Sequence, residues 1–169
     1  MTDDTLPACG PTDSAPADAT LTDSVVTAWV LLNRAQRAVL AGIEADLKAA
    51  GLPPLGWYDA LLELKRGADG ALRPLEIEQR LLLAQHNVSR LIDRLESAGY
   101  VARKRCESDG RGQMIAITDD GRALLARMWP VYRAAIATHV GARLGQDASA
   151  ATLAELLGRL AGAAPGSRS

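Results

Sequence analysis

The chain has 169 residues, with 19 Lys and Arg against 20 Asp and Glu, and 48% of its residues are hydrophobic. This length suits one ordinary domain, and the apolar content is typical of globular rather than collagen-like or fully disordered chains. The longest apolar runs are a few residues, whereas a membrane-spanning helix needs about 20. No signal-peptide pattern opens the chain. We therefore expect a globular protein of the cytoplasm.

Residues that carry chemistry are sparse. The two cysteines, Cys9 and Cys106, lie too far apart in the sequence to suggest a disulfide framework or a zinc site. The sequence has no Gly-rich phosphate loop, no His-Glu-x-x-His and no Cys-x-x-Cys motif, and only two histidines. We therefore expect neither an enzyme nor a bound metal or cofactor.

The net charge of −1 conceals an uneven distribution. The first 23 residues hold five Asp and no Lys or Arg, so the remaining residues carry 19 basic against 15 acidic side chains. Residues 1–20 also contain three prolines and few large apolar side chains, which predicts a disordered acidic tail. The part expected to fold is mildly basic.

A long amphipathic helix is predicted over 22–50. Apolar residues recur there at intervals of three and four, namely Val25, Trp29, Leu32, Val39, Leu40, Ile43 and Leu47. Gly51, Pro53 and Pro54 end it. At 1.5 Å per residue it is about 40 Å long, which exceeds what a small domain covers. We expect part of it to pack on a partner chain.

Three more helices and a hairpin follow in order. The pattern predicts helices over 56–66, 75–82 and 85–98, with a short strand at Leu72 and Gly99 as the last stop signal. The period then changes to two over 100–106 and 113–117, around a turn-rich loop, which predicts a β-hairpin. Thr118 caps a helix that runs to about Leu144 with an expected kink at Pro130, and a last helix covers 149–161.

This order is that of a winged helix-turn-helix, in which a braced helix enters the major groove of DNA and the hairpin reaches the minor groove. The predicted fold is mainly α with a small β-hairpin wing. Polar and basic side chains gather on the outer face of helix 85–98 and on the hairpin; they are Gln85, His86, Asn87, Ser89, Arg90, Arg94, Arg103, Lys104, Arg105 and Arg111. Gln, Asn and Arg can pair with base edges, and Ser89 suits a phosphate.

Three segments resemble the MarR family of bacterial transcriptional regulators. They are 88–103, 108–112 with its Asp-x-Arg pattern, and 117–125, which opens Thr-x-x-Gly after Ile117. The resemblance implies that Arg111 enters the minor groove and that Asp109 orients it by an ion pair. Ala84 and Leu82 depart from the family pattern, since relatives often have a capping Ser or Thr and a turn glycine there.

The resemblance also implies a homodimer joined through its terminal helices. The expected division is a tail over 1–20, a helical dimerisation region over 21–55 and 118–163, and a DNA-binding lobe over 56–117. Two recognition helices of such a dimer lie about 34 Å apart and match a pseudo-palindromic operator.

In relatives, small aromatic or phenolic effectors bind where the long helices meet the DNA-binding lobe. The residues expected to line such a site are Trp29, Trp57, Tyr58, Asp59 and Tyr132, with Arg34 and Arg37 as polar partners. Aromatic side chains at helical spacing are also usual core residues, so packing alone is the competing interpretation. His139, near Tyr132 in sequence, is expected to be a packing or dimer-contact histidine.

The leading hypothesis is a dimeric, sequence-specific repressor of transcription that binds double-stranded DNA and is released by a small ligand. One alternative is a redox-responsive regulator of the same fold that uses Cys106, which follows Lys104 and Arg105. Another is a winged helix that contacts protein instead of DNA.

Overall fold

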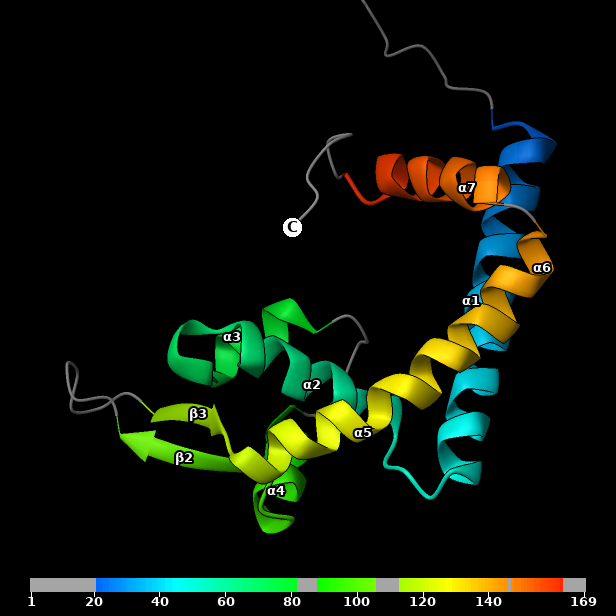
Figure 1. Cartoon of the computed structure of the whole chain (residues 1–169). Helices are drawn as coiled ribbons and strands as arrows, with labels where there is room; N and C mark the ends of the chain where they lie inside the picture. The colour runs from blue at the N-terminus through cyan, green and yellow to red at the C-terminus, as the bar shows by residue number, and fades with distance from the viewer. Residues whose placement is uncertain (1–20, 82–87, 106–112, 146, 163–169) are drawn as a thin grey trace, which may run out of the picture. The chain divides into compact units, whose positions relative to one another are not determined.

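The computed structural model describes residues 21–81, 88–105, 113–145 and 147–162 (Figure 1). The chain divides into two units, Met1–Ala35 and Gln36–Ser169, which are treated separately here. The predicted tail over 1–20, both cysteines, and the departures at Leu82 and Ala84 lie outside the described residues. Among the described helices, none is long and apolar enough to cross a membrane.

Helix α1 spans Asp23–Ala49 and confirms the long helix predicted over 22–50. Ile43 and Leu47, in its second half, are buried in the core of the larger unit. Its first half differs, because the large apolar side chains there are exposed; they are Val25, Val26, Trp29, Val30 and Leu31.

The next elements form a small lobe of helices and strands. In chain order they are α2 (Leu55–Arg66), a 3-10 turn (Ala68–Gly70), β1 (Ala71–Leu72), α3 (Pro74–Arg80), α4 (Val88–Ser97), β2 (Val101–Arg105) and β3 (Gln113–Ile117). The predicted hairpin is confirmed, with Val101 opposite Ile117. The short strand predicted at Leu72 extends it, because Leu72 pairs antiparallel with Ile115 and gives the sheet order β1-β3-β2.

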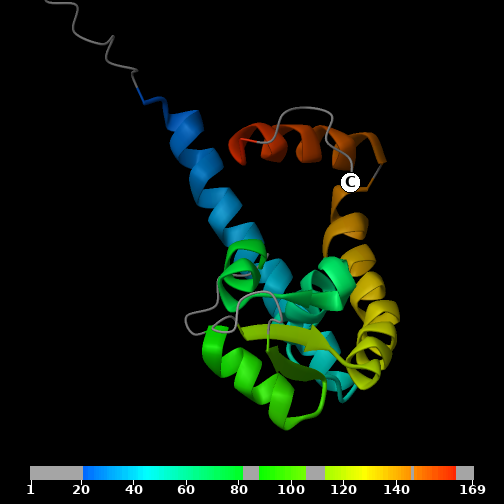
Figure 2. The same cartoon turned by 90° about the vertical axis from the view of Figure 1, so that its left-hand side faces the viewer.

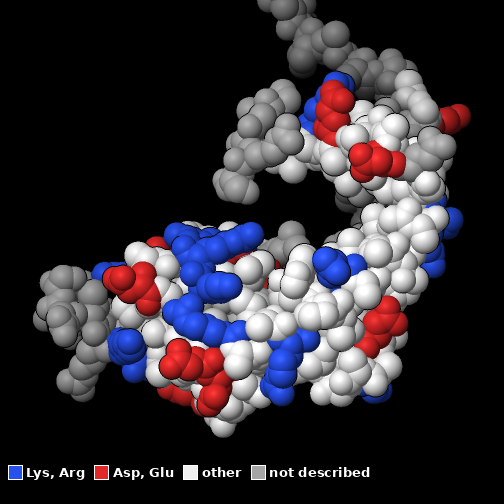
Figure 3. All heavy atoms as spheres, in the orientation of Figure 1, with Lys and Arg blue, Asp and Glu red and all other residues white. Residues whose placement is uncertain are grey.

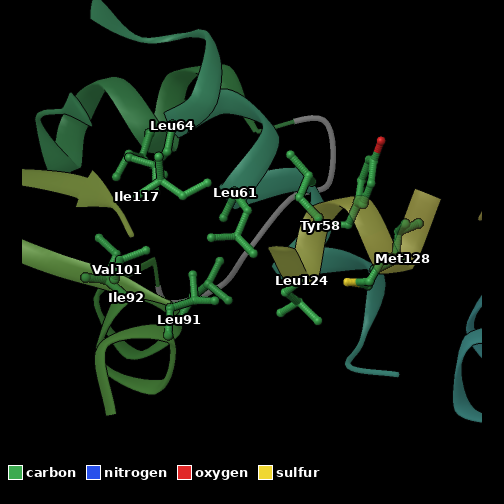
Figure 4. Packing of buried hydrophobic residues seen from close by; sticks show 14 of the residues in the cluster. Tyr58, Leu61, Leu64, Leu91, Ile92, Val101, Ile117, Leu124 and Met128 are labelled. Atoms are coloured by element: carbon green, nitrogen blue, oxygen red, sulfur yellow. The ribbon is translucent and has the colours of Figure 1, made fainter. Parts of the chain in front are cut away.

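The core of this lobe is built from leucine and isoleucine side chains of α2, α4, the sheet and the start of the next long helix. Leu61, Leu64, Leu95, Ile115 and Leu124 are each at most 1% exposed. Figure 4 shows Leu91, Ile92 and Val101 in the same cluster as Leu61 and Ile117. Helix α4 and the hairpin therefore share one apolar core.

Helix α5 spans Asp119–Ile136 and continues through a π-helical segment (Ala137–Gly141) into α6 (Ala142–Leu144), as predicted for 118–144. Pro130 lies inside α5. Thr118 caps the helix by accepting a hydrogen bond from Gly121 N at 3.1 Å. The last helix, α7, spans Asp147–Leu160 and contains no buried residue.

The π-helical segment meets α1 at a glycine. A Cβ added at Gly42 would lie 2.5 Å from the His139 ring, so only glycine leaves room for that ring. His139 Nε2 lies 2.9 Å from Asp46 Oδ2, one turn further along α1. His139 is therefore the packing histidine that the sequence indicated.

Candidate nucleic-acid interface

Helix α4 separates an apolar face from a polar one. Leu91, Ile92 and Leu95 are buried, with at most 7% of each residue exposed. Ser89, Arg90 and Arg94 are exposed, as the sequence predicted. Gln85, His86 and Asn87, which were assigned to the same outer face, lie outside the described residues. The described part of α4 thus presents two arginines and a serine to a partner.

The start of the hairpin is fixed to the end of α4 by backbone and side-chain hydrogen bonds. Tyr100 N donates to Leu95 O at 2.9 Å, and Thr118 N donates to Tyr100 O at 3.1 Å. The Thr118 hydroxyl also donates to Gly99 O at 2.7 Å. Thr118 therefore serves two purposes, since it caps α5 and holds the base of the wing.

Arg103, on β2, forms ion pairs with two acids of α4, Asp93 and Glu96. The hydrogen bond that Arg103 donates to Asp93, with the negative charge of Glu96, raises the pKa of the Arg103 guanidinium above its already high ordinary value. The sequence placed Arg103 among residues that contact DNA. The structure shows it paired with these two acids of α4, partners of which periodicity gave no sign, and its contact with DNA stays a prediction.

Other wing residues of the predicted interface are only partly described. Lys104 is exposed. The side chain of Arg105, and Asp109, Arg111 and Cys106 as whole residues, lie outside the described part. Figure 3 shows Lys and Arg side chains gathered, with acids between them, over the region where Figure 1 draws α2, α3 and the sheet. This mixture agrees with the modest basic excess of the sequence.

The aromatic residues predicted to line an effector site are brought together only in part. Tyr58 and Tyr132 contact each other with ring centroids 5.0 Å apart. Trp57 faces Tyr100 instead, at 5.8 Å, and Trp29 belongs to the other unit.

Sequence reasoning missed Trp129. Its ring centroid lies 6.3 Å from that of Tyr58 and 6.1 Å from that of Tyr132. Its spacing of three residues before Tyr132 on α5 is the signal that could have found it. The exposed fraction of Trp129 is 46%, so this cluster reaches the surface.

Burial raises the pKa of both tyrosines of this cluster, which are neutral phenols at pH 7. Desolvation, with a smaller contribution from Tyr132, raises the pKa of Tyr58 above 10.0. Desolvation, with a contribution from the nearby carboxylate of Asp59, raises the pKa of Tyr132. Asp59 is itself buried, with 6% exposed. The cluster can therefore offer neutral phenols as hydrogen-bond donors beside an aromatic surface.

Comparison with known proteins matches residues 50–112 to the MarR family model, which covers α2 through β2 and ends before β3. Among curated relatives, the transcriptional regulator PecS of Dickeya dadantii is 38% identical over 72 residues, 42% of this chain and 43% of PecS. The uncharacterised transcriptional regulator YkoM of Bacillus subtilis is 33% identical over 104 residues, 62% of this chain and 66% of YkoM. The chain thus spans about two fifths of the length of the first curated relatives that it matches.

A solved structure extends the likeness to most of the chain. Sco3205 of Streptomyces coelicolor, a MarR family transcriptional regulator solved in complex with DNA, is 27% identical. The match covers 83% of this chain and 88% of Sco3205 with a TM-score of 0.73. These relatives are named as regulators, in agreement with the expectation that the chain is not an enzyme. The family match over residues 50–112, the relatives and the shared winged-helix fold identify a MarR family winged-helix region in this chain.

Proposed function

We propose that this protein is a sequence-specific, DNA-binding regulator of transcription that acts as a homodimer on a pseudo-palindromic operator. The observation that carries the proposal is the division of α4, which buries Leu91, Ile92 and Leu95 and exposes Arg90 and Arg94. A helix held in this way fits a major groove about 12 Å wide. Sco3205, with a similar fold, was solved in complex with DNA.

In this proposal, α4 reads bases and the wing contacts the backbone and minor groove. Arg90 and Arg94 are suited to bidentate pairing with guanine, and Ser89 to a phosphate. The remaining proposed contacts are those of the sequence prediction, Gln85, His86, Asn87, Arg105 and Arg111, with Asp109 orienting Arg111.

The second copy covers apolar surface that the described chain leaves exposed. Helix α7 buries none of its residues, and exposed fractions along it reach 50% at Leu156 and 74% at Leu160. The first half of α1 exposes Trp29 to 65%. Burial of apolar surface stabilises by about 25 cal/mol per Å². A symmetric dimer through 21–55 and 118–163 is therefore stabilised by covering these exposed side chains.

We assign the cluster of Tyr58, Asp59, Trp129 and Tyr132 to a small aromatic or phenolic effector. The supporting observations are its partial exposure through Trp129 and the raised pKa of both tyrosines. In this proposal the protein is a repressor, and binding of the effector there releases it from its operator. A regulator of this kind acts in the cytoplasm, where bacterial DNA lies.

DNA binding is tested by fluorescence anisotropy on duplexes from the region upstream of the protein's own gene. We expect nanomolar to micromolar binding that weakens steeply with salt, because neutralised phosphates release counterions. Arg90→Ala lowers the affinity about tenfold or more, since one bidentate contact discriminates by about 1–3 kcal/mol. Arg133→Ala, which removes an equal charge from α5, is the matched control and stays within about twofold, the effect expected of a surface change away from the contacts.

Equal affinities of Arg90→Ala and the parent would show that α4 does not make the assigned contact. If the parent chain showed no salt-dependent DNA binding at all, a winged helix that contacts protein would be the better account. Repeating the titration with a panel of small aromatic acids tests the effector, which must lower DNA affinity in the parent and less so in Tyr132→Ala.

A further inference from the structure

We propose that Arg103 is a positioning residue, which holds the wing against the recognition helix through Asp93 and Glu96 and contributes to DNA binding by that geometry rather than by contacting phosphate. The inference rests on the proposed function and adds a role for three charged residues within it. We call these three the α4–wing bracket.

The three residues are placed by regular secondary structure. Asp93 and Glu96 are three residues apart on α4, so they project from one side of the helix. Arg103 pairs with Ile115 in the antiparallel register of β2 and β3. Because side chains alternate along a strand, Arg103 shares the hairpin face of buried Val101, and Lys104 points to the other face. The face of Arg103 is therefore the one that packs on α4.

The bracket holds a part of the hairpin that the other contacts do not reach. Hydrogen bonds of Thr118 and Tyr100 fix the base of the wing to Gly99 and Leu95. Arg103 lies three residues further out along β2, toward the loop that carries Arg111. Figure 2 shows β2 beside α4, and these two elements are in contact. A second tie there fixes the angle between the wing and the recognition helix.

A contact with DNA does not by itself explain the charges of the bracket. Asp93 and Glu96 stand on the helix proposed to enter the major groove, where carboxylates repel phosphate. The guanidinium of Arg103 is engaged by both, and a planar guanidinium donates to carboxylates in a fixed fork. The two acids thus have a structural partner that explains their position.

The bracket predicts whether DNA affinity rises or falls when the two acids are neutralised. Asp93→Asn with Glu96→Gln removes two negative charges from the recognition helix, so electrostatics alone would strengthen DNA binding. We expect the opposite, a loss of about three- to tenfold, because the wing loses its second tie. Glu78→Gln, which removes an exposed acid from α3, is the control and leaves affinity unchanged or slightly raised.

The salt dependence separates positioning from contact. In Arg103→Gln we expect a similar three- to tenfold loss with the slope of log affinity against log salt unchanged. A lost phosphate contact would instead reduce that slope by about 0.9 per contact. If the affinity and the salt slope both fall in Arg103→Gln, the proposal is wrong.

Charge reversal supplies a rescue that a purely local folding effect cannot mimic. Arg103→Glu weakens binding further than Arg103→Gln, and the pair Arg103→Glu with Glu96→Arg recovers part of the loss. Thermal unfolding of all variants stays within a few degrees of the parent, about 4 °C, because exposed ion pairs contribute little to stability. No recovery in the exchanged pair contradicts the bracket.

Hydrogen exchange on the free protein keeps the bracket testable even if the proposed function fails. We expect the amides of β2 and β3 beyond Lys104 to exchange at least about threefold faster in Arg103→Gln than in the parent or in Lys104→Gln. Unchanged exchange overturns the bracket. A parent chain that binds no DNA refutes the proposed function while leaving this result to decide the bracket.

Discussion

The lobe formed by α2 to β3 and the terminal helices differ in where their apolar residues lie. In the lobe, Leu61, Leu64 and Leu95 are buried within one chain. In α7 and the first half of α1, leucine, valine and tryptophan side chains are exposed. Both regions show the same helical spacing of apolar residues, so spacing alone predicts burial without telling which chain supplies the partner. The lobe buries its apolar residues within one chain, and a second copy that covers the terminal helices is the dimer of the proposed function.

The largest effect on the free energy of unfolding is expected from a substitution in the buried core of the lobe. Leu95→Ala leaves a cavity under α4 and lowers the free energy of unfolding by about 2–5 kcal/mol, measured by urea denaturation. The control Leu75→Ala removes a leucine that is 63% exposed on α3 and changes it by less than about 0.5 kcal/mol. Equal effects of the two variants would contradict the lobe core described here.

The role of the exposed apolar residues of α7 is tested by replacing one of them with a charged residue. Leu156→Glu, at a side chain 50% exposed in the single chain, converts the dimer to a folded monomer in sedimentation velocity. Because two copies bind one operator in the proposed function, we expect DNA affinity to fall about 100-fold, or about 2.7 kcal/mol. Ala151→Glu adds the same charge to the other face of α7 and leaves the dimer intact. A Leu156→Glu protein that still sediments as the parent does would refute this interface.

A substitution at the junction between the lobe and α5 is expected to change the folding free energy less. Thr118→Ala removes the helix cap and the hydrogen bond to Gly99, and costs about 1 kcal/mol of folding free energy. Thr118→Ser retains the hydroxyl and most of the stability in the same urea titration. If alanine and serine are equally stable, the hydroxyl is not what stabilises this junction.

The smallest effect is a pH dependence at the aromatic cluster. Burial raises the pKa of Tyr58 and Tyr132 in the folded chain, so their stabilisation is present below the unfolded value of about 10 and is lost as pH rises above it. Urea unfolding from pH 8 to 10.5 shows this loss in the parent and less of it in Tyr58→Phe. The same slope in both proteins would mean that this phenol is not desolvated.

Much of the fold follows from local signals in the sequence. The apolar spacing of α1 and α4, the stop at Gly99 and the cap at Thr118 depend on neighbours in the chain, so their elements were predicted correctly. The alternation that predicts the hairpin also sets the register of Val101 with Ile117.

Long-range partners could not be predicted in the same way. Arg103 finds Asp93 and Glu96 only when β2 lies on α4, and Trp129 joins Tyr58 only when α5 lies on α2. Trp57, next to Tyr58 in sequence, faces Tyr100 because consecutive helical residues point in different directions. The roles of Gln85, His86, Asn87, Asp109 and Arg111 remain predictions, since these residues lie outside the described ranges.

The central claim is that two copies of a modestly basic α4 surface bind one DNA site together. It is tested most directly by measuring the stoichiometry and affinity of the parent chain on a full operator duplex and on a duplex holding only one half-site. We predict two chains on the full operator and at least about 100-fold weaker binding to the half-site. One chain per duplex with equal affinity for both would contradict the claim.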